Sequence, residues 1–265
     1  MKKLISIAIC VLLLATLGLT GCSKEASALK VATNAEFEPF ESRDKDTNEI
    51  IGFDVDLIEA IAEKMNSKIE FSDMEFEGVI AAVQSKSVNL AISGLTITPK
   101  RKLSVDFSEP YYIGAAQMVI TRADDAVFTG TTKAQVDEQL KGKNIGVCSG
   151  FTGESYVNGD DDLGFEKIEG ATATVFDSIA FAIIALQQNA IDCIIMDDSV
   201  ARKAVTSDEN KDKLKLIDIA LTIEEYAIAV PKGDAELKKQ IDDALNALKQ
   251  DGTLNTLLTK WELNG

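Results

Sequence analysis

Short apolar runs alternate with helical patterns along most of this 265-residue chain, and this alternation limits the folds that the chain can adopt. In the first half, strand-like runs at residues 29–33, 68–71 and 89–93 are separated by helical periodicity at residues 54–65 and 78–86. Consecutive parallel strands need a crossover helix, so this order predicts a parallel sheet with helices on both faces. Ligands of such sheets bind at the carboxyl ends of the strands.

The same order begins again in the second half of the chain. Residues 193–196 form an apolar run, which suits a strand covered on both faces. We therefore expect two α/β lobes, each built on a mostly parallel sheet, with a pocket between them. The predicted first lobe comprises residues 29–112 and 225–265, and the second comprises residues 113–224. Crossover segments are expected near residues 111–114 and 222–226, and Asp54 is expected to cap the first helix.

The absence of histidine excludes several kinds of chemistry. No Ser-His-Asp triad, Cys-His dyad, histidine zinc site or imidazole pH switch can be built from this chain. With 27 basic and 43 acidic residues, the net charge is −16, which argues against a nucleic-acid partner because phosphate binding needs a basic surface. The acidic cluster at residues 160–162 lacks the ligand spacing of a calcium loop. We expect an acidic, non-catalytic protein with no metal and no cofactor.

The N-terminus has the layout of a bacterial export signal. Lys2 and Lys3 precede an uncharged apolar run at residues 4–19, which is short for a membrane span. The segment Leu19-Thr20-Gly21-Cys22 resembles the lipobox of bacterial lipoproteins, in which the cysteine is acylated. We therefore predict a signal peptide at residues 1–21, a lipidated Cys22 and a tether at residues 22–28. The alternative is an ordinary secretory signal that happens to contain a cysteine.

Two further cysteines follow in the mature chain. Cys148 ends the strand-like run at residues 144–148, whereas Cys193 begins the run at residues 193–196. If these runs are neighbouring parallel strands, the sulfur atoms lie near opposite strand ends, beyond the range of a disulfide. Both thiols are therefore expected to be free.

Several segments, taken together and in order, are similar to one known family. They are ATNAEFEPF at 32–40, GFDVDL at 52–57, SGLTITPKR at 93–101, VDFSEPYY at 105–112, GVCSG at 146–150, DCIIMD at 192–197 and the tail at 251–261. As a set they resemble the extracellular solute-binding proteins of polar amino-acid ABC transporters. The resemblance implies a type II periplasmic-binding-protein fold, in which two lobes close over a free amino acid. It also implies a monomer that delivers its ligand to the permease subunits of an importer. With the lipid anchor, the protein would act on the extracytoplasmic face of the cell membrane.

The resemblance assigns Arg101 to the α-carboxylate of the ligand. A guanidinium can bind a carboxylate with two parallel hydrogen bonds. The turn at Gly150, Phe151 and Thr152 precedes an expected helix, whose first N–H groups would bind the same carboxylate from the other lobe. Alternatively, Arg101 is an exposed helical arginine and the turn serves only as a helix cap.

Asp197 is assigned by the same resemblance to the ammonium group of the ligand. The hydroxyl group of Thr96 and backbone groups of Ser93 and Gly94 would assist it. The alternative is that Asp197 caps the following helix, although Asp198 could take that role and leave Asp197 for the ligand.

Three aromatic residues complete the proposed pocket. Phe37 and Phe76 match positions whose rings flank the ligand side chain, although each could instead be an ordinary core residue. Asn34 stands where the family often has aspartate, and its amide carries no charge. Cys148 and Phe151 add soft or apolar wall, so a neutral amino acid is the expected ligand.

Two other functions are compatible with the sequence. A dehydratase of cyclohexadienyl acids on the same scaffold would need an acidic residue with a raised pKa in the cleft near Arg101. A sensor or adhesin lipoprotein without a transport partner is the other alternative.

Overall fold

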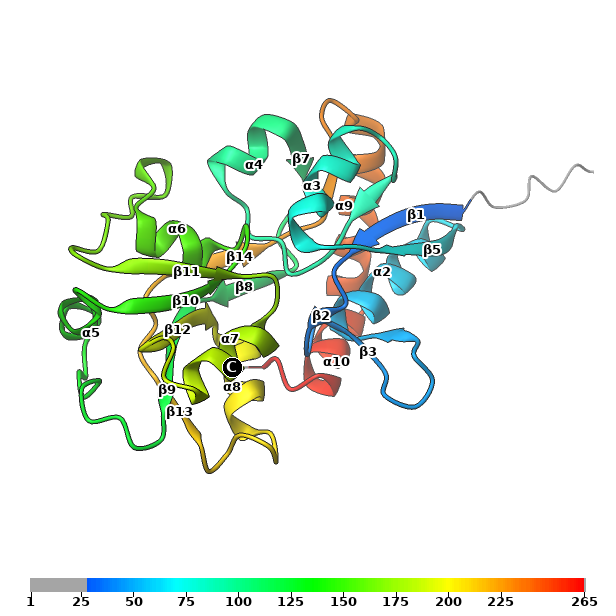
Figure 1. Cartoon of the computed structure of the whole chain (residues 1–265). Helices are drawn as coiled ribbons and strands as arrows, with labels where there is room; N and C mark the ends of the chain where they lie inside the picture. The colour runs from blue at the N-terminus through cyan, green and yellow to red at the C-terminus, as the bar shows by residue number, and fades with distance from the viewer. Residues whose placement is uncertain (1–27, 265) are drawn as a thin grey trace, which may run out of the picture.

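A computed structural model of the chain describes residues 28–264. Two five-stranded sheets form two lobes, and a two-stranded ribbon connects them (Figure 1). The predicted two-lobe α/β architecture is therefore present. The signal peptide and the lipidation residue Cys22 lie outside the described residues. Within residues 28–264, no helix has the length and apolarity needed to cross a membrane.

The sheet of the first lobe has the strand order β5-β1-β6-β15-β7. These strands are β1 (Ala28–Thr33), β5 (Lys68–Asp73), β6 (Leu90–Ala91), β7 (Val105–Phe107) and β15 (Ala229–Pro231). The helices of this lobe are α2 (Phe53–Lys64), α3 (Phe76–Gln84), α4 (Pro99–Ser104), α9 (Ala235–Gln250) and α10 (Thr253–Lys260). A small sheet of β2 (Glu36–Phe37), β3 (Glu41–Arg43) and β4 (Ile50–Ile51) lies beside α2.

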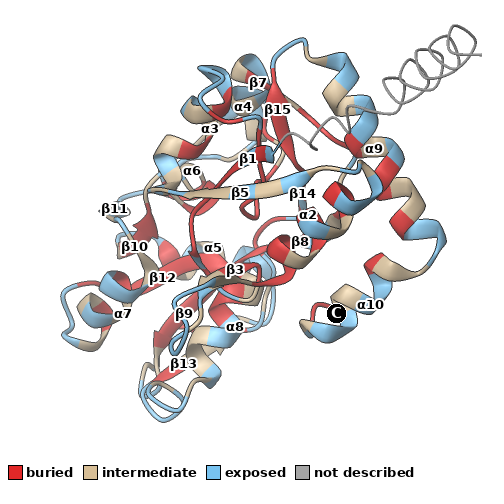
Figure 2. Ribbon diagram, turned by 90° about the vertical axis from the view of Figure 1, so that its right-hand side faces the viewer, coloured by how far each residue is buried: buried red, intermediate tan, exposed pale blue. Residues whose placement is uncertain are grey.

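The sheet of the second lobe has the order β11-β10-β12-β9-β13. Its strands are β9 (Gln117–Arg122), β10 (Asn144–Cys148), β11 (Thr172–Phe176), β12 (Cys193–Asp197) and β13 (Leu214–Ile217). Its helices are α5 (Lys133–Leu140), α6 (Thr152–Asn158), α7 (Ile179–Gln187) and α8 (Asp198–Thr206), with a short 3₁₀ turn at Asp161–Leu163. Figure 2 shows that buried residues gather along the strands of both sheets.

In each sheet four of the five strands run in the same direction, so the sheets are mostly parallel, as predicted, with one reversed strand in each. β1 and β10 pair in parallel with both of their neighbours, as the β–α–β order requires. β15 and β9 run antiparallel to theirs. Each of these two strands enters its sheet from the connecting ribbon rather than from a crossover helix, which reverses its direction.

The connecting ribbon consists of β8 (Tyr112–Ala115) and β14 (Glu224–Tyr226), which pair antiparallel. These strands coincide with the two predicted crossover segments. Tyr226 is fully buried there, with its ring centroid 5.2 Å from that of Phe40 and 5.6 Å from that of Tyr112. An aromatic cluster therefore packs the first lobe against the ribbon.

Helix α2 begins one residue before the predicted position, and Asp54 does not cap it. The residue at the N-cap position is Gly52, and no side chain caps the helix. Gly52 has a φ of 146°, and a Cβ atom there would lie 2.0 Å from the carbonyl oxygen of Phe40. The chain therefore requires glycine at this entry point, and Asp54 is buried in the first turn with other partners.

Cys148 and Cys193 are both free and buried, as predicted. β10 and β12 are parallel neighbours in which Ile145 is the partner of Cys193. Cys148 therefore lies three residues further along its strand. Burial raises the pKa of the Cys148 thiol to about 12, so this thiol is protonated and unreactive at neutral pH.

Candidate functional site

A small cavity lies between the two lobes, and most of the predicted site residues line it. The first lobe contributes Phe37, Phe76, Gly94, Thr96 and Arg101, while the second contributes Phe151, Thr152 and Asp197. The cavity volume is about 10 Å³, which is room for about one water molecule. In this conformation the side chains of the two lobes therefore fill most of the space between them.

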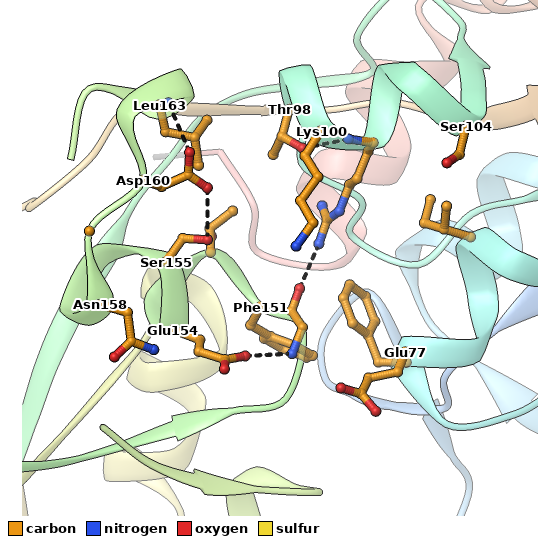
Figure 3. Close-up of a pocket in the computed structure, with 16 residues that line it drawn as sticks. Glu77, Thr98, Lys100, Ser104, Phe151, Glu154, Ser155, Asn158, Asp160 and Leu163 are labelled. Atoms are coloured by element: carbon orange, nitrogen blue, oxygen red, sulfur yellow. Dashed lines mark hydrogen bonds between the residues drawn. The ribbon is translucent and has the colours of Figure 1, made fainter. Parts of the chain in front are cut away.

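Arg101 connects the two lobes at this cavity. Its backbone is placed by α4, where the side chain of Thr98 caps the helix by accepting the Arg101 N–H at 3.1 Å. Its guanidinium donates to the carbonyl of Thr96 at 2.8 Å and, across the cleft, to the carbonyl of Gly150 at 3.1 Å (Figure 3). The guanidinium also lies 5.3 Å from the ring centroid of Phe76.

The charge of Arg101 is not neutralised by a direct ion pair within residues 28–264. Burial lowers the pKa of its guanidinium, while the more distant carboxylates of Glu224 and Asp197 act in the opposite direction. A partly buried cation bonded only to neutral carbonyl groups attracts an anion.

Asp197 ends β12 and is almost fully buried. It occupies the N-cap position of α8, yet its side chain makes no capping hydrogen bond. Its carboxylate instead accepts a hydrogen bond from the hydroxyl of Tyr226. Burial, followed by the nearby charge of Glu224, raises the pKa of Asp197 to about 7. At neutral pH this carboxyl group is therefore only partly ionised.

Glu224 is a central residue that the sequence analysis missed. It lies on β14 and is buried between the lobes. Its carboxylate accepts hydrogen bonds from the hydroxyls of Thr96 at 2.7 Å, Thr152 at 2.9 Å and Thr222 at 2.8 Å. The only sequence signal for Glu224 was the predicted crossover at residues 222–226, which contains it.

The rings of the predicted aromatic wall contact one another across the cleft. The centroid of Phe151 lies 4.3 Å from that of Phe76 and 5.6 Å from that of Phe37. Nearby, the hydroxyl of Ser149 in the second lobe donates to the carboxylate of Glu77 in the first lobe. These contacts and the Arg101 bond hold the lobes together.

The predicted anion-binding turn is partly occupied by the chain itself. The carboxylate of Glu154 accepts the N–H of Gly150 at 3.0 Å, as Figure 3 shows, and the N–H of Phe151 donates to the carbonyl of Cys148. Helix α6 begins at Thr152, whose hydroxyl is bonded to Glu224.

Three predicted site residues do not line the cavity. The side-chain amide of Asn34 donates to the carbonyl of Met74, and the hydroxyl of Ser93 donates to Glu41. Cys148 is packed in the hydrophobic core. Their polar groups are directed into the protein in this conformation.

A larger cavity, of about 520 Å³, lies on the outer side of the aromatic wall. It shares Phe76, Arg101, Phe151 and Thr152 with the inner cavity, and Lys100 projects into it (Figure 3). Asp160, from the acidic cluster at its edge, caps the following turn by accepting the N–H groups of Asp162 and Leu163. No group of three or more metal-ligating side chains occurs among residues 28–264.

Comparison with known proteins identifies the family. Residues 29–264 match the bacterial extracellular solute-binding proteins, family 3. The chain belongs to this family. It is 32% identical to the arginine-binding extracellular protein ArtP of Bacillus subtilis strain 168, over 98% of each chain.

Solved structures of the family have the same fold. One is the arginine-, lysine-, histidine-binding protein ArtJ from Geobacillus stearothermophilus, with 32% identity, a TM-score of 0.76 and coverage of 88% of this chain and 94% of that one. Another is an ancestral arginine-binding protein bound to glutamine, with 35% identity, a TM-score of 0.76 and coverage of 88% and 97%. The fold is the type II periplasmic-binding-protein fold, and the chain is a solute-binding protein of an amino-acid ABC transporter.

The raised pKa values in the cleft predict that the protein is more stable in mild acid. Asp54 and Asp197 have pKa values of about 6 and about 7 instead of 3.8. In the folded protein these two carboxyl groups bind protons more tightly than they do in the unfolded chain. This stabilisation is therefore greatest below pH 4 and is lost as the pH rises through 6 to 7, by roughly 1.4 kcal/mol per pKa unit.

Thermal unfolding of the ligand-free protein at pH 5 and pH 8 measures this effect. We expect a higher midpoint at pH 5, and Asp197→Asn should reduce the difference between the two midpoints. The exposed control Asp212→Asn should leave it unchanged. A wild-type difference retained in Asp197→Asn would contradict the assignment.

Proposed function

We propose that this protein captures a free L-amino acid with a neutral side chain between its lobes and delivers it to the permease of an ABC importer. The observation that carries the proposal is the inner cavity, where Arg101 and Asp197 face each other from different lobes. A guanidinium and a carboxylate on opposite walls are complementary to the two charges of a zwitterion. The protein itself supplies no chemistry in this proposal and acts only as a binding protein.

Closure of the two lobes follows from the same arrangement. Arg101 would exchange its bond with the Gly150 carbonyl for two bonds to the ligand carboxylate, while Asp197 binds the ammonium group. A ligand that contacts both lobes favours the closed state. We propose that lobe 1 comprises residues 29–112 and 225–265 and lobe 2 comprises residues 113–224, with the β8 and β14 ribbon as the hinge.

The neutral side chain is proposed from the wall of the pocket. The three aromatic rings of Phe37, Phe76 and Phe151 can surround an uncharged group. The ancestral protein of this fold that was solved with glutamine supports such a ligand. Basic ligands are the competing choice, because ArtP and ArtJ bind them and because Glu224 adds a second carboxylate to the cleft.

A screen of the twenty L-amino acids by thermal shift, followed by calorimetry, tests this proposal. We expect a neutral amino acid to raise the unfolding midpoint most, since a ligand at 100 times its Kd adds about 2.7 kcal/mol. Arginine, lysine or histidine as the preferred ligand would overturn the neutral assignment.

The variant Arg101→Ala tests the role of the guanidinium. Removing one partner of a buried charge pair costs about 2–5 kcal/mol, so we expect a Kd that is weaker by roughly thirtyfold or more, measured by calorimetry. Arg202→Ala, which removes a surface arginine paired with Asp218, is the matched control and should bind normally. Tight binding by Arg101→Ala would refute the carboxylate role.

A dehydratase of cyclohexadienyl acids is the second candidate function. The observation in its favour is Asp197, an acid with a raised pKa in the same cavity as Arg101. We favour binding because burial accounts for most of that shift and because the relatives are binding proteins. Turnover of a cyclohexadienyl acid by the purified protein would reverse the choice.

We also propose that the protein is a monomer held on the extracytoplasmic face of the cell membrane by acyl chains on Cys22. The supporting observation is the sequence Leu19-Thr20-Gly21-Cys22 after an uncharged apolar run. Acyl chains bind a membrane surface without a spanning segment. In cell fractionation, Cys22→Ala should move the protein from the membrane to the soluble or unprocessed fraction. An unchanged membrane fraction with no acyl label on the wild type would exclude the anchor.

A further inference from the structure

Two acidic side chains lie together beneath the ligand-binding turn. Glu41 on β3 and Asp54 in the first turn of α2 are both fully buried, with 0% of their surface exposed. They come from different elements but lie close together, because the N–H of Asp54 donates to the carbonyl of Phe40, the residue before Glu41, at 2.9 Å. Each carboxyl group also alters the pKa of the other. Burial of one carboxylate without a cation is already unfavourable, and burial of two adjacent ones is far more so.

Both carboxyl groups are bonded to the predicted binding turn. Glu41 accepts a hydrogen bond from the hydroxyl of Ser93 at 2.6 Å, and the Ser93 oxygen in turn accepts the N–H of Asn34 at 3.0 Å. Asp54 accepts the N–H of Gly94 at 2.8 Å and the hydroxyl of Tyr111 at 2.8 Å. The pair therefore joins the turn at residues 93–94 to the first strand and to the hinge.

One oxygen of each carboxyl group has no hydrogen-bond donor among the described residues. These atoms are Oε2 of Glu41 and Oδ1 of Asp54. The nearest charged groups do not supply a donor for these two oxygens. Arg43 is paired with Asp73 at 2.7 Å, and Asp73 adds negative charge near Glu41. A proton between the two orphan oxygens would satisfy both of them and remove one of the two charges.

We propose that Glu41 and Asp54 share a single proton, and that this carboxyl pair positions the binding turn at Ser93 and Gly94. The proton belongs on Glu41, because Asp54 already accepts two hydrogen bonds and is better stabilised as the anion. The acid group of Glu41 then donates to Asp54, and its other oxygen accepts from Ser93. Both residues are positioning residues, since neither lines the ligand cavity.

The pair affects the ligand pocket through Gly94. This residue has a φ of 52°, and a Cβ atom there would lie 2.5 Å from the ring of Phe37. The backbone of Gly94 therefore packs directly against an aromatic wall of the cavity. Loss of the shared proton would leave two repelling carboxylates under this turn, and the Phe37 wall would move with it. The link to ligand affinity rests on the proposed function, but the shared proton does not.

Carboxyl spectroscopy and amide hydrogen exchange test the pair without a ligand. In addition to the signal of partly protonated Asp197, the infrared spectrum of the wild type at pH 7 should contain a carboxylic acid signal from Glu41. Glu41→Gln should lose that signal but keep slow exchange at the Gly94 amide, because its amide group can donate to Asp54 and accept from Ser93. Asp54→Asn should also lose the signal, because its amide donates to an ionised Glu41.

A third variant and a control complete the experiment. In Glu41→Leu, the backbone amides of Gly94 and Asn34 should exchange hydrogen at least tenfold faster than in the wild type. The control Glu63→Gln, at an exposed position on α2, should match the wild type in both the infrared and the exchange measurements. An acid signal in Glu41→Gln as strong as that of the wild type, or unchanged exchange in Glu41→Leu, would overturn the proposal.

The thermal-shift screen of the twenty L-amino acids separates this proposal from the proposed function. We expect Glu41→Gln to keep the wild-type response and Glu41→Leu to lose most of it. A wild type that responds to none of the twenty would refute the proposed function, and the acid signal would still decide the shared proton.

Discussion

A partly buried guanidinium that lacks an ionic partner is the interaction on which the arrangement of this protein depends. Arg101 is bonded to one carbonyl group of each lobe, at Thr96 and Gly150. Two neutral carbonyls compensate a partly buried cation only in part, so the guanidinium retains an attraction for an anion. Because one of the two carbonyls belongs to the other lobe, the same guanidinium also joins the two lobes.

The acidic residues near that cation fall into three groups. Asp197 faces it across the cavity, and Glu224 joins three hydroxyl groups at the ribbon between the lobes. Beneath the binding turn, Glu41 and Asp54 form a separate buried pair. The net charge of −16 therefore has two components. Most of it is solvated surface charge, while a few buried carboxyl groups hold the binding surfaces in place.

The sequence predicted the elements of this fold well where periodicity was strong. Strand β1 and helix α2 lie within one residue of their predicted positions because their apolar spacing has one structural solution. The sheets are mostly parallel, as predicted, but the sequence did not identify β9 and β15 as the reversed strands, because strand polarity depends on how the chain returns through the hinge. Local pattern contains no information on that path.

The site residues were predicted from the family resemblance, with similar limits. Arg101 and Asp197 follow strand ends in recognisable motifs, and both line the cavity. Glu224 and the partners of Asp54 were missed because their roles arise from contacts between distant segments. In the sequence, Asp54 stands where an ordinary helix cap would stand. Only its burial in the structure distinguishes that role from its bonding to Gly94 and Tyr111.

A crystal structure of the protein grown with its preferred amino acid would test the central role of Arg101 most directly. We predict that the α-carboxylate of the amino acid lies on the guanidinium of Arg101, with its ammonium group against Asp197, in the cavity between the lobes. An amino acid bound in the outer cavity, or bound with its carboxylate away from Arg101, would contradict that role.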